Sequence, residues 1–221
     1  MLSGNVLKLI AAVSMLSDHI GLMFFPEIRI FRIFGRLAYP IFAYMIGEGC
    51  RYTRNKRMYI AKLLIVAFLC QMGYFIYEGS LDMCIMVTFS LSVAVAFSLQ
   101  RAQLAQGTEQ RFLRYIELAG AVAGVWIANR YLDIDYGFWG CIIPVLPLLV
   151  ADRSLYVKGI VFGAGLVILA WDYGGVQWYS LLALPLIGLY NQKRGRYNLK
   201  YFFYIFYPLH LMVLEIIKNV T

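Results

Sequence analysis

The 221-residue chain is 62% hydrophobic and 16% aromatic, and only 14% of its residues are charged. Soluble globular domains carry about 25% charged residues, so this composition excludes an ordinary soluble protein and predicts a polytopic membrane protein. The formal net charge of +8 would raise the question of nucleic acid in a soluble protein. Here the basic residues fall in short loops between apolar segments, where such charges orient a membrane protein, so we expect no nucleic-acid partner.

Breaks at polar, glycine-containing and proline-containing stretches divide the chain into nine apolar segments. A helix needs about 20 residues to cross the ~30 Å hydrocarbon core, and the shorter segments fit helices enclosed by others. We therefore expect an all-α transmembrane helical bundle that forms one integral membrane domain over residues 1–221. The nine predicted spans cover residues 6–25, 33–50, 58–77, 82–98, 113–128, 137–151, 157–171, 176–190 and 199–217.

Most Lys and Arg residues fall in alternate loops, and the remaining loops carry Asp and Glu. Because cytoplasmic loops are enriched in Lys and Arg, this alternation predicts a cytoplasmic N-terminus and an extracytoplasmic C-terminus. One basic cluster, formed by Arg29, Arg32 and Arg36, breaks the rule because it lies on the outer side of the first hairpin. The position of this cluster therefore has another explanation, such as binding of an anion or pairing with Asp18 or Glu27.

The first predicted span carries Asp18 and His19 side by side, well beyond its midpoint. A charged side chain in the membrane costs about 2.5–3.5 kcal/mol on insertion scales, so such residues normally face a protein interior or a wet cavity. Lys8 precedes His19 by eleven residues, close to three helical turns, which places both on nearly one face about 16 Å apart. Lys8 is also near enough to the cytoplasmic surface to snorkel.

Further polar positions fall in the second and ninth predicted spans. Arg36 and Tyr39 lie near the outer start of the second span, and Glu48 lies near its cytoplasmic end. His210 lies past the middle of the ninth span, at a depth similar to that of His19. Asp18 either fixes the tautomer of His19 or, because neighbouring helical side chains point about 100° apart, pairs with Arg36. Arg36 is then either a functional group or an interfacial anchor.

Imidazole exchanges protons near neutral pH, and with carboxylate and guanidinium groups it suits proton removal from an incoming nucleophile beside an anion-binding wall. This combination predicts group transfer without a covalent enzyme intermediate. A proton-coupled transporter would use the same residues as a relay, whereas a non-catalytic assembly factor would need none of them. The sequence has no HExxH motif, Walker loop or nucleophile elbow, and its four cysteines are dispersed, so we expect no metal site.

Distinctive motifs occur along the whole chain: Ser17-Asp18-His19-Ile20-Gly21, Gly35-Arg36-Leu37-Ala38-Tyr39-Pro40 and Tyr207-Pro208-Leu209-His210, with residues 135–140 and 183–191. Together these segments resemble TraX-type membrane proteins. The resemblance implies a membrane acetyltransferase that uses acetyl-CoA, since the family's namesake acetylates the N-terminus of conjugative F-pilin. It also implies distant kinship with the membrane acyltransferase-3 superfamily, which modifies surface polysaccharides and carries Arg, ten residues and then His in its first helix. Here Lys8 stands in place of that Arg and supplies a point charge, not a bidentate fork.

The resemblance also implies roles for individual residues. His19 would be the general base, and Asp18 and Arg36 would complete the catalytic group. Lys8, Tyr39 and Glu48 would contact acetyl-CoA, and the pocket would be lined by Tyr207, His210, Asp135 and Tyr136. The enzyme would lie in the bacterial inner (plasma) membrane, among lipids, and would modify an amine or hydroxyl of an envelope acceptor: a pilin-like N-terminus, a glycan or a lipid. A homo-oligomer is compatible with this picture.

Overall fold

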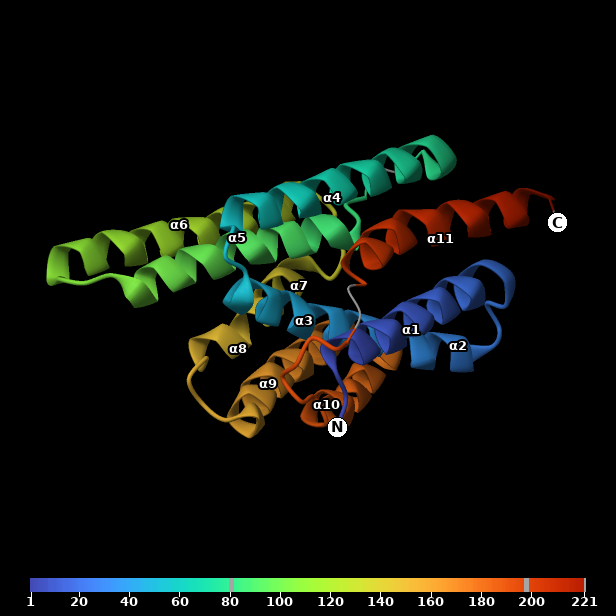
Figure 1. Cartoon of the computed structure of the whole chain (residues 1–221). Coiled ribbons are helices and arrows are strands. Elements are labelled where there is room, and N and C mark those ends of the chain that lie inside the picture. Colours follow the sequence, from blue (N-terminus) through green and yellow to red (C-terminus); the bar gives the residue numbers. More distant parts are fainter. Residues whose placement is uncertain (80–81, 197–198, 221) are drawn as a thin grey trace. The chain divides into compact units, whose positions relative to one another are not determined.

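The computed structural model describes residues 1–79, 82–196 and 199–220, and their regular elements are all helices (Figure 1). Extended pairing among these residues is confined to two isolated bridges, Leu2 with Tyr190 and Met83 with Ile134. The all-α prediction is therefore confirmed. The helices are α1 (Gly4–Phe24), α2 (Arg29–Gly35), α3 (Ala38–Tyr52), α4 (Lys56–Glu78), α5 (Ile85–Leu104), α6 (Thr108–Tyr131), α7 (Gly137–Ile142), η1 (Ile143–Val145), α8 (Leu146–Leu149), α9 (Leu155–Tyr173), η2 (Gly175–Leu182), α10 (Ala183–Gly188) and α11 (Lys200–Val220).

Within the described ranges, six helical segments are long and apolar enough to cross a membrane: Gly4–Phe24, Arg29–Tyr52, Lys56–Ile76, Ile85–Leu104, Leu155–Tyr173 and Tyr201–Val220. Each of the nine predicted spans overlaps helix, but three of them are not among these six. The predicted span 113–128 lies in α6, which carries Arg114, Glu117 and Arg130 between its apolar residues. The predicted spans 137–151 and 176–190 correspond to the shorter apolar helices Gly137–Leu149 and Gly175–Gly188. The structure thus supports a membrane protein with six candidate spans.

The described part of the chain forms two compact units. Unit 1 contains the described residues of 1–45 and 163–221, and unit 2 contains those of 46–162. The boundaries fall inside α3 and α9, so neither helix belongs to one unit alone. The single domain over residues 1–221 stays a prediction.

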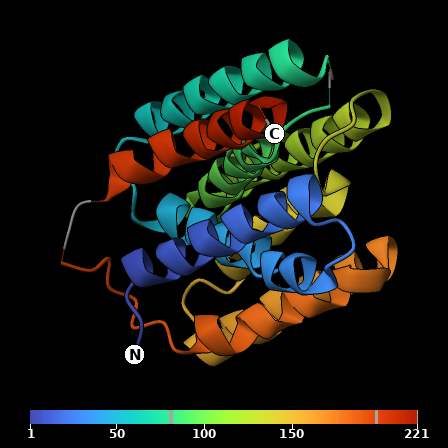
Figure 2. The same cartoon turned by 90° about the vertical axis from the view of Figure 1, so that its right-hand side faces the viewer.

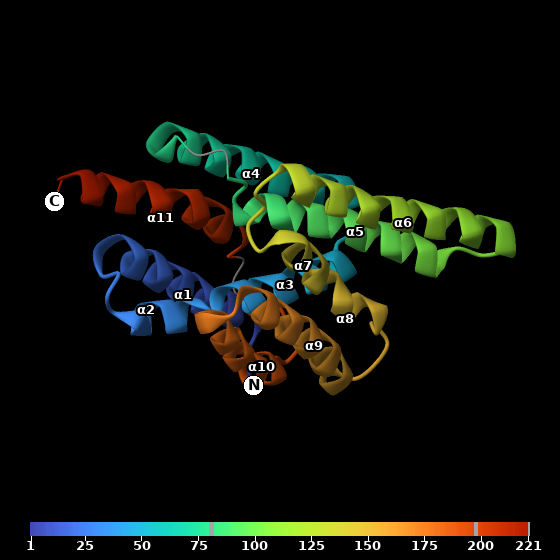
Figure 3. The same ribbon diagram turned by 180° about the vertical axis from the view of Figure 1, so that it is seen from behind.

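In unit 2, α5 packs against α4 and α6, and also against α7, η1 and α8 (Figure 3). Most of α5 is buried, including several hydroxyl side chains. Ser90 donates to the carbonyl of Met86 at 2.7 Å and Ser92 to that of Thr88 at 2.9 Å. These bonds within the helix satisfy polar groups that would otherwise be costly in an apolar interior.

In unit 1, α1 and α2 form a closely packed hairpin (Figure 2). The hydroxyl of Ser3 accepts a hydrogen bond from the backbone N–H of Val6 at the start of α1. Two glycines allow the helices to approach: a Cβ on Gly21 would meet Phe31, and a Cβ on Gly35 would meet Asp18. Because these positions carry no side chain, Asp18 lies directly against the backbone of α2.

The predicted second span is two helices rather than one. It was expected to begin at residue 33, but helix already starts at Arg29, and α2 ends at Gly35 before α3 begins at Ala38. Pro40 is the third residue of α3, where a missing backbone N–H is tolerated because the first turn has no intrahelical acceptor for it. Arg36 therefore follows α2 directly rather than standing at the start of a continuous span.

Gly35→Ala should destabilise the protein by about 1–3 kcal/mol, because the new methyl group overlaps Asp18 and must displace it from its ion pairs. Gly73→Ala in α4 is the matched control, since an added Cβ there meets nothing within 4 Å. The control should be neutral or stabilising by up to about 1 kcal/mol, because alanine favours helix. Thermal unfolding in detergent measures both changes. Equal midpoints for the two variants would show that the close contact at Gly35 is absent.

Candidate functional site

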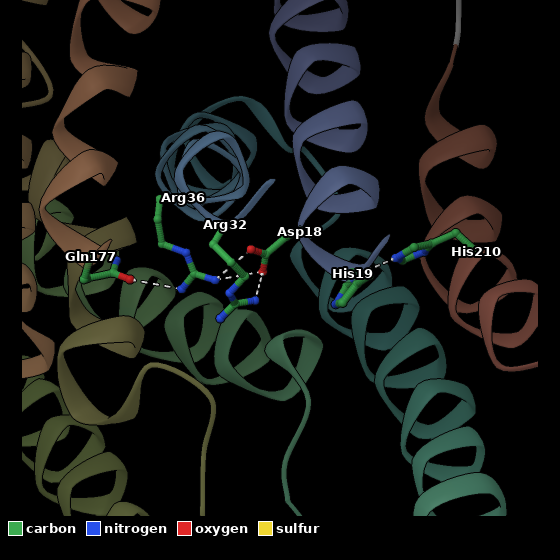
Figure 4. A network of polar contacts seen from close by, with 6 residues as sticks. All are labelled: Asp18, His19, Arg32, Arg36, Gln177 and His210. Carbon is green, nitrogen blue, oxygen red and sulfur yellow. Dashed lines mark hydrogen bonds and ion pairs between the residues drawn. The ribbon is translucent and has the colours of Figure 1, made fainter. Parts of the chain in front are cut away.

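Asp18 of α1 is held by two guanidinium groups. Arg36 donates through one terminal nitrogen to both carboxylate oxygens, at 3.0 and 2.8 Å, and Arg32 lies 2.9 Å from Oδ2 (Figure 4). The side chains of Asp18 and Arg36 are 16% and 11% exposed. The sequence left open whether Asp18 orients His19 or pairs with Arg36, and in the structure it pairs with Arg36.

The local fold explains this cluster. Arg32 and Arg36 are four residues apart, so a helical path along α2 brings both side chains to one face. The backbone N–H of Arg36 caps α2 by bonding to carbonyls of its last turn, which fixes the residue just after the helix. Gly35 then allows α1 to bring Asp18 against this face. The basic cluster that breaks the charge rule of the loops is thus partly explained by its pairing with Asp18.

Gln177 of η2 joins the cluster, although it was not predicted as a site residue from the sequence. Its Oε1 accepts from Arg36 at 3.2 Å, and the residue is only 3% exposed. Because a guanidinium can only donate, this contact fixes the amide orientation and directs Nε2 elsewhere. That Nε2, and the hydroxyl of Ser180 three residues later, are buried without a hydrogen-bond partner among the described residues. An amide in an otherwise apolar segment was the available sequence signal.

The cluster carries a surplus of positive charge. Two guanidinium groups surround one carboxylate, so the three side chains together bear one net positive charge. The charge is half-buried, where its field is screened less than at a surface. Such a cluster is suited to an anionic or strongly polar group beside it.

His19 and His210 form a second cluster, on another side of α1 (Figure 4). Nδ1 of His19 lies 2.9 Å from Nε2 of His210, and the ring centroids are 5.0 Å apart. The predicted similar depth of the two histidines is therefore matched by direct contact between α1 and α11. Because Asp18 and His19 are consecutive helical residues, the Asp18–arginine cluster and the histidine pair face different neighbours.

The ring of His210 is fixed by its own helix. Nδ1 lies 2.9 Å from the carbonyl oxygen of Phe206, and the Phe206 ring stacks on the imidazole at 5.0 Å with an interplanar angle of 5°. Tyr207, predicted to line the pocket, meets the imidazole edge at 5.6 Å. His210 is 6% exposed and Tyr207 is 7% exposed, so both of these α11 side chains are enclosed mainly by protein.

Lys8 and His19 share the face of α1 that meets α11, as their spacing predicts. The ammonium of Lys8 lies 5.8 Å from the ring centroid of Phe203, in the range of a cation–π interaction. His19 contacts His210 further along the same helix. Tyr39, at the start of α3 in unit 1, is buried with 3% exposure.

Three predicted site residues belong to unit 2. Glu48 is 8% exposed and lies 3.9 Å from Arg51. The carbonyl of Asp135 accepts from the hydroxyl of Thr88 at 2.8 Å, and Tyr136 caps α7 in a left-handed conformation with φ of 59°. Their assignment to the donor site or the pocket stays a prediction. Across the part of the chain that the structure describes, no three His, Cys, Asp or Glu side chains gather into a metal-binding group.

The sequence of this chain was compared with those of known proteins and protein families. The family model described as TraX protein matches residues 3–218. A probable fimbrial assembly protein, FimC of serogroup H1 from Dichelobacter nodosus, is 26% identical over 94% of this chain and 92% of its own length. An uncharacterized protein, RP591 of Rickettsia prowazekii (strain Madrid E), is 46% identical over 20% of this chain and 17% of its own. No solved structure matches the chain. Because the family model covers nearly every residue, the chain belongs to the TraX family.

Proposed function

We propose that this chain is an integral membrane acetyltransferase, with acetyl-CoA as donor, an amine or hydroxyl of an envelope component as acceptor and His19 as general base. The observation that carries the proposal is the bonded pair of imidazoles, His19 of α1 and His210 of α11, two helices apolar and long enough to span a membrane. Intramembrane titratable residues are rare and usually functional. Membership of the TraX family supports acetyl transfer over other proton-dependent chemistry.

His19 would take a proton from the acceptor nitrogen or oxygen as that atom bonds to the acetyl carbonyl carbon. General bases of this kind contribute about 10²–10⁴-fold to rate. Acetyl-CoA supplies an activated acetyl group. As the carbon–sulfur bond breaks, His19 would return the proton to the departing thiolate, so the free thiol leaves and the base is regenerated.

The arginine cluster would hold a polar part of a substrate rather than act on His19. Arg32 and Arg36 keep a net positive charge after pairing with Asp18, and Gln177 directs a buried amide N–H away from Arg36. In this role Arg36 would stabilise negative charge on the acyl oxygen or on the acceptor. Lys8, near the start of α1, would meet the phosphates of the donor, and Tyr39 would support the pantetheine arm.

The acceptor that fits best is the N-terminus of a pilin-like subunit. The relative from Dichelobacter nodosus is named as a probable fimbrial assembly protein and aligns along 92% of its length. A surface glycan is the second candidate acceptor. We place the protein in the inner (plasma) membrane, where a cytoplasmic donor and an envelope acceptor can reach the same helices.

We further propose that all nine predicted segments cross the membrane, with the N-terminus cytoplasmic and the C-terminus outside. An alkaline phosphatase fusion at the C-terminus should be active, and one inserted at Gln106, in a basic loop, should be inactive. If only the six long apolar helices crossed, both chain ends would lie on one side and the C-terminal fusion would be inactive. Fusion activity normalised to protein level decides between these topologies.

The function is tested by mass spectrometry of envelope proteins and glycans from cells with and without this chain. We expect one or more components to carry an acetyl group only when the chain is present. Identical acetylation in the two envelopes would refute the proposal. If proteoliposomes instead moved a solute with protons and no acetyl-CoA, the histidine pair would belong to a transporter.

A further inference from the structure

We propose that His210 is a positioning residue: it accepts the Nδ1–H of His19 and thereby leaves Nε2 of His19 as the basic nitrogen. The assignment of the proton follows from the hydrogen bonds and from the burial of His210. Its consequence for acetyl transfer rests on the proposed function, because only a general base needs a defined free nitrogen.

The direction of the bonds is set by Phe206. Its carbonyl oxygen can only accept, so the Nδ1 of His210 that lies 2.9 Å away must carry a hydrogen. A neutral imidazole carries one N–H, so Nε2 of His210 has a lone pair. Nδ1 of His19 lies 2.9 Å from that lone pair and is therefore the donor. A neutral His19 with its hydrogen on Nδ1 has its own lone pair on Nε2.

A cationic His210 would reverse the second bond, but the surroundings disfavour it. His210 is 6% exposed and lies between the rings of Phe206 and Tyr207. The carboxylate nearest in sequence to the pair, Asp18, is bonded to Arg32 and Arg36. Burying a cation without a carboxylate partner costs several kcal/mol. The neutral form of His210 is thus the one that this environment supports.

His210 has the same role toward His19 as the carboxylate has toward the histidine of a catalytic triad. The partner selects one tautomer and holds the ring plane, and it stabilises the imidazolium that forms when the base takes a proton. The stacked ring of Phe206 and the bond to its carbonyl keep the His210 ring from turning. Once His19 is charged, its bond to His210 becomes a charge-assisted hydrogen bond, which is stronger than the neutral one.

The chain offers a clean measurement because it contains two histidines. Nitrogen-15 NMR of histidine-labelled full-length protein in detergent reports which ring nitrogen of His19 carries the hydrogen. His210→Gln places an amide oxygen near the former Nε2 and keeps an acceptor for His19. His210→Asn is one methylene shorter, so its amide can meet the Phe206 carbonyl but cannot reach His19. Thermal midpoints of both variants verify that α11 still packs on α1.

We expect His19 to carry its hydrogen on Nδ1 in the wild type and in His210→Gln, and to move it wholly or partly to Nε2 in His210→Asn. Acetyl transfer should follow the tautomer: near normal for Gln and lower by roughly ten-fold or more for Asn, because the Asn variant loses part of the contribution of the general base. The proposal would be overturned if His19 carried its hydrogen on Nε2 in the wild-type protein. It would also be overturned if the tautomer of His19 were unchanged in His210→Asn. A Gln variant as inactive as the Asn variant would overturn it too, because a proton would then have to pass through His210.

Failure here is separable from failure of the proposed function. If the tautomers behave as expected but no envelope component is acetylated, His210 still positions His19 and the acetyltransferase assignment is lost. If acetylation is present but the tautomer of His19 does not change when residue 210 is replaced, the protein is still an acetyltransferase and His210 has no positioning role.

Discussion

Replacing His19 with alanine should lower acetyl transfer by about 10²–10⁴-fold, the usual contribution of a general base. The side chain is half-buried at the contact with His210, so its removal takes away the basic nitrogen without exposing a new charge. The measurement is the rate at which envelope components gain an acetyl group in cells that make equal amounts of wild-type or variant protein. We expect the variant to remain in the membrane and to unfold near the wild-type temperature.

Ser17→Ala on the same helix is the matched control for His19→Ala. It shortens a neighbouring polar side chain that is half-buried to a similar degree, but it removes no titratable group. Its acetylation rate should stay near that of the wild type. If His19→Ala acetylated envelope components as fast as Ser17→Ala does, His19 would be excluded as the base.

Replacing Asp18 with asparagine should cause the largest loss of stability among single charge changes, about 3–5 kcal/mol, because two half-buried guanidinium groups lose their counter-ion. For a chain of this length that loss corresponds to a fall of about 6–20 °C in the unfolding midpoint. The triple variant Asp18→Asn, Arg32→Gln and Arg36→Gln should recover part of the loss, since it leaves no unpaired charge. Thermal unfolding in detergent measures all of these variants.

Glu117→Gln provides the matched control for the Asp18 variant. Glu117 also bridges two arginines, Arg101 and Arg114, but its side chain is 33% exposed and theirs are 49% and 40% exposed. Exposed ion pairs contribute about 0–1 kcal/mol, so this variant should lose little stability. Equal losses at the two carboxylates would mean that Asp18 is no more buried than a surface acid.

Some parts of the site could be predicted from sequence spacing. Eleven residues are nearly three helical turns, which is why Lys8 and His19 were expected on one face, and both meet α11. The similar depth of His19 and His210 could be predicted because their spans were expected to run in the same direction. Their direct bond could not be predicted, because residues at the same depth can lie on helices that are not neighbours.

Other parts depend on packing that spacing does not encode. The pairing of Asp18 with Arg36 requires the close approach at Gly35, which no periodicity reveals. The break of the second predicted span at Arg36 went unseen because its apolar pattern continues through the turn. Gln177 was missed for a related reason: a single amide in an apolar segment resembles a tolerated polar residue until a guanidinium is placed 3.2 Å away.

The most direct test is the transfer of isotope-labelled acetyl groups into sealed, inside-out membrane vesicles supplied with acetyl-CoA on their outer, originally cytoplasmic, face. Vesicles that contain the wild-type chain should incorporate the label into a component of the lumen, and vesicles that contain His19→Ala should not. Label that enters equally in vesicles without the chain, or only on the outer face, would contradict transfer through this protein.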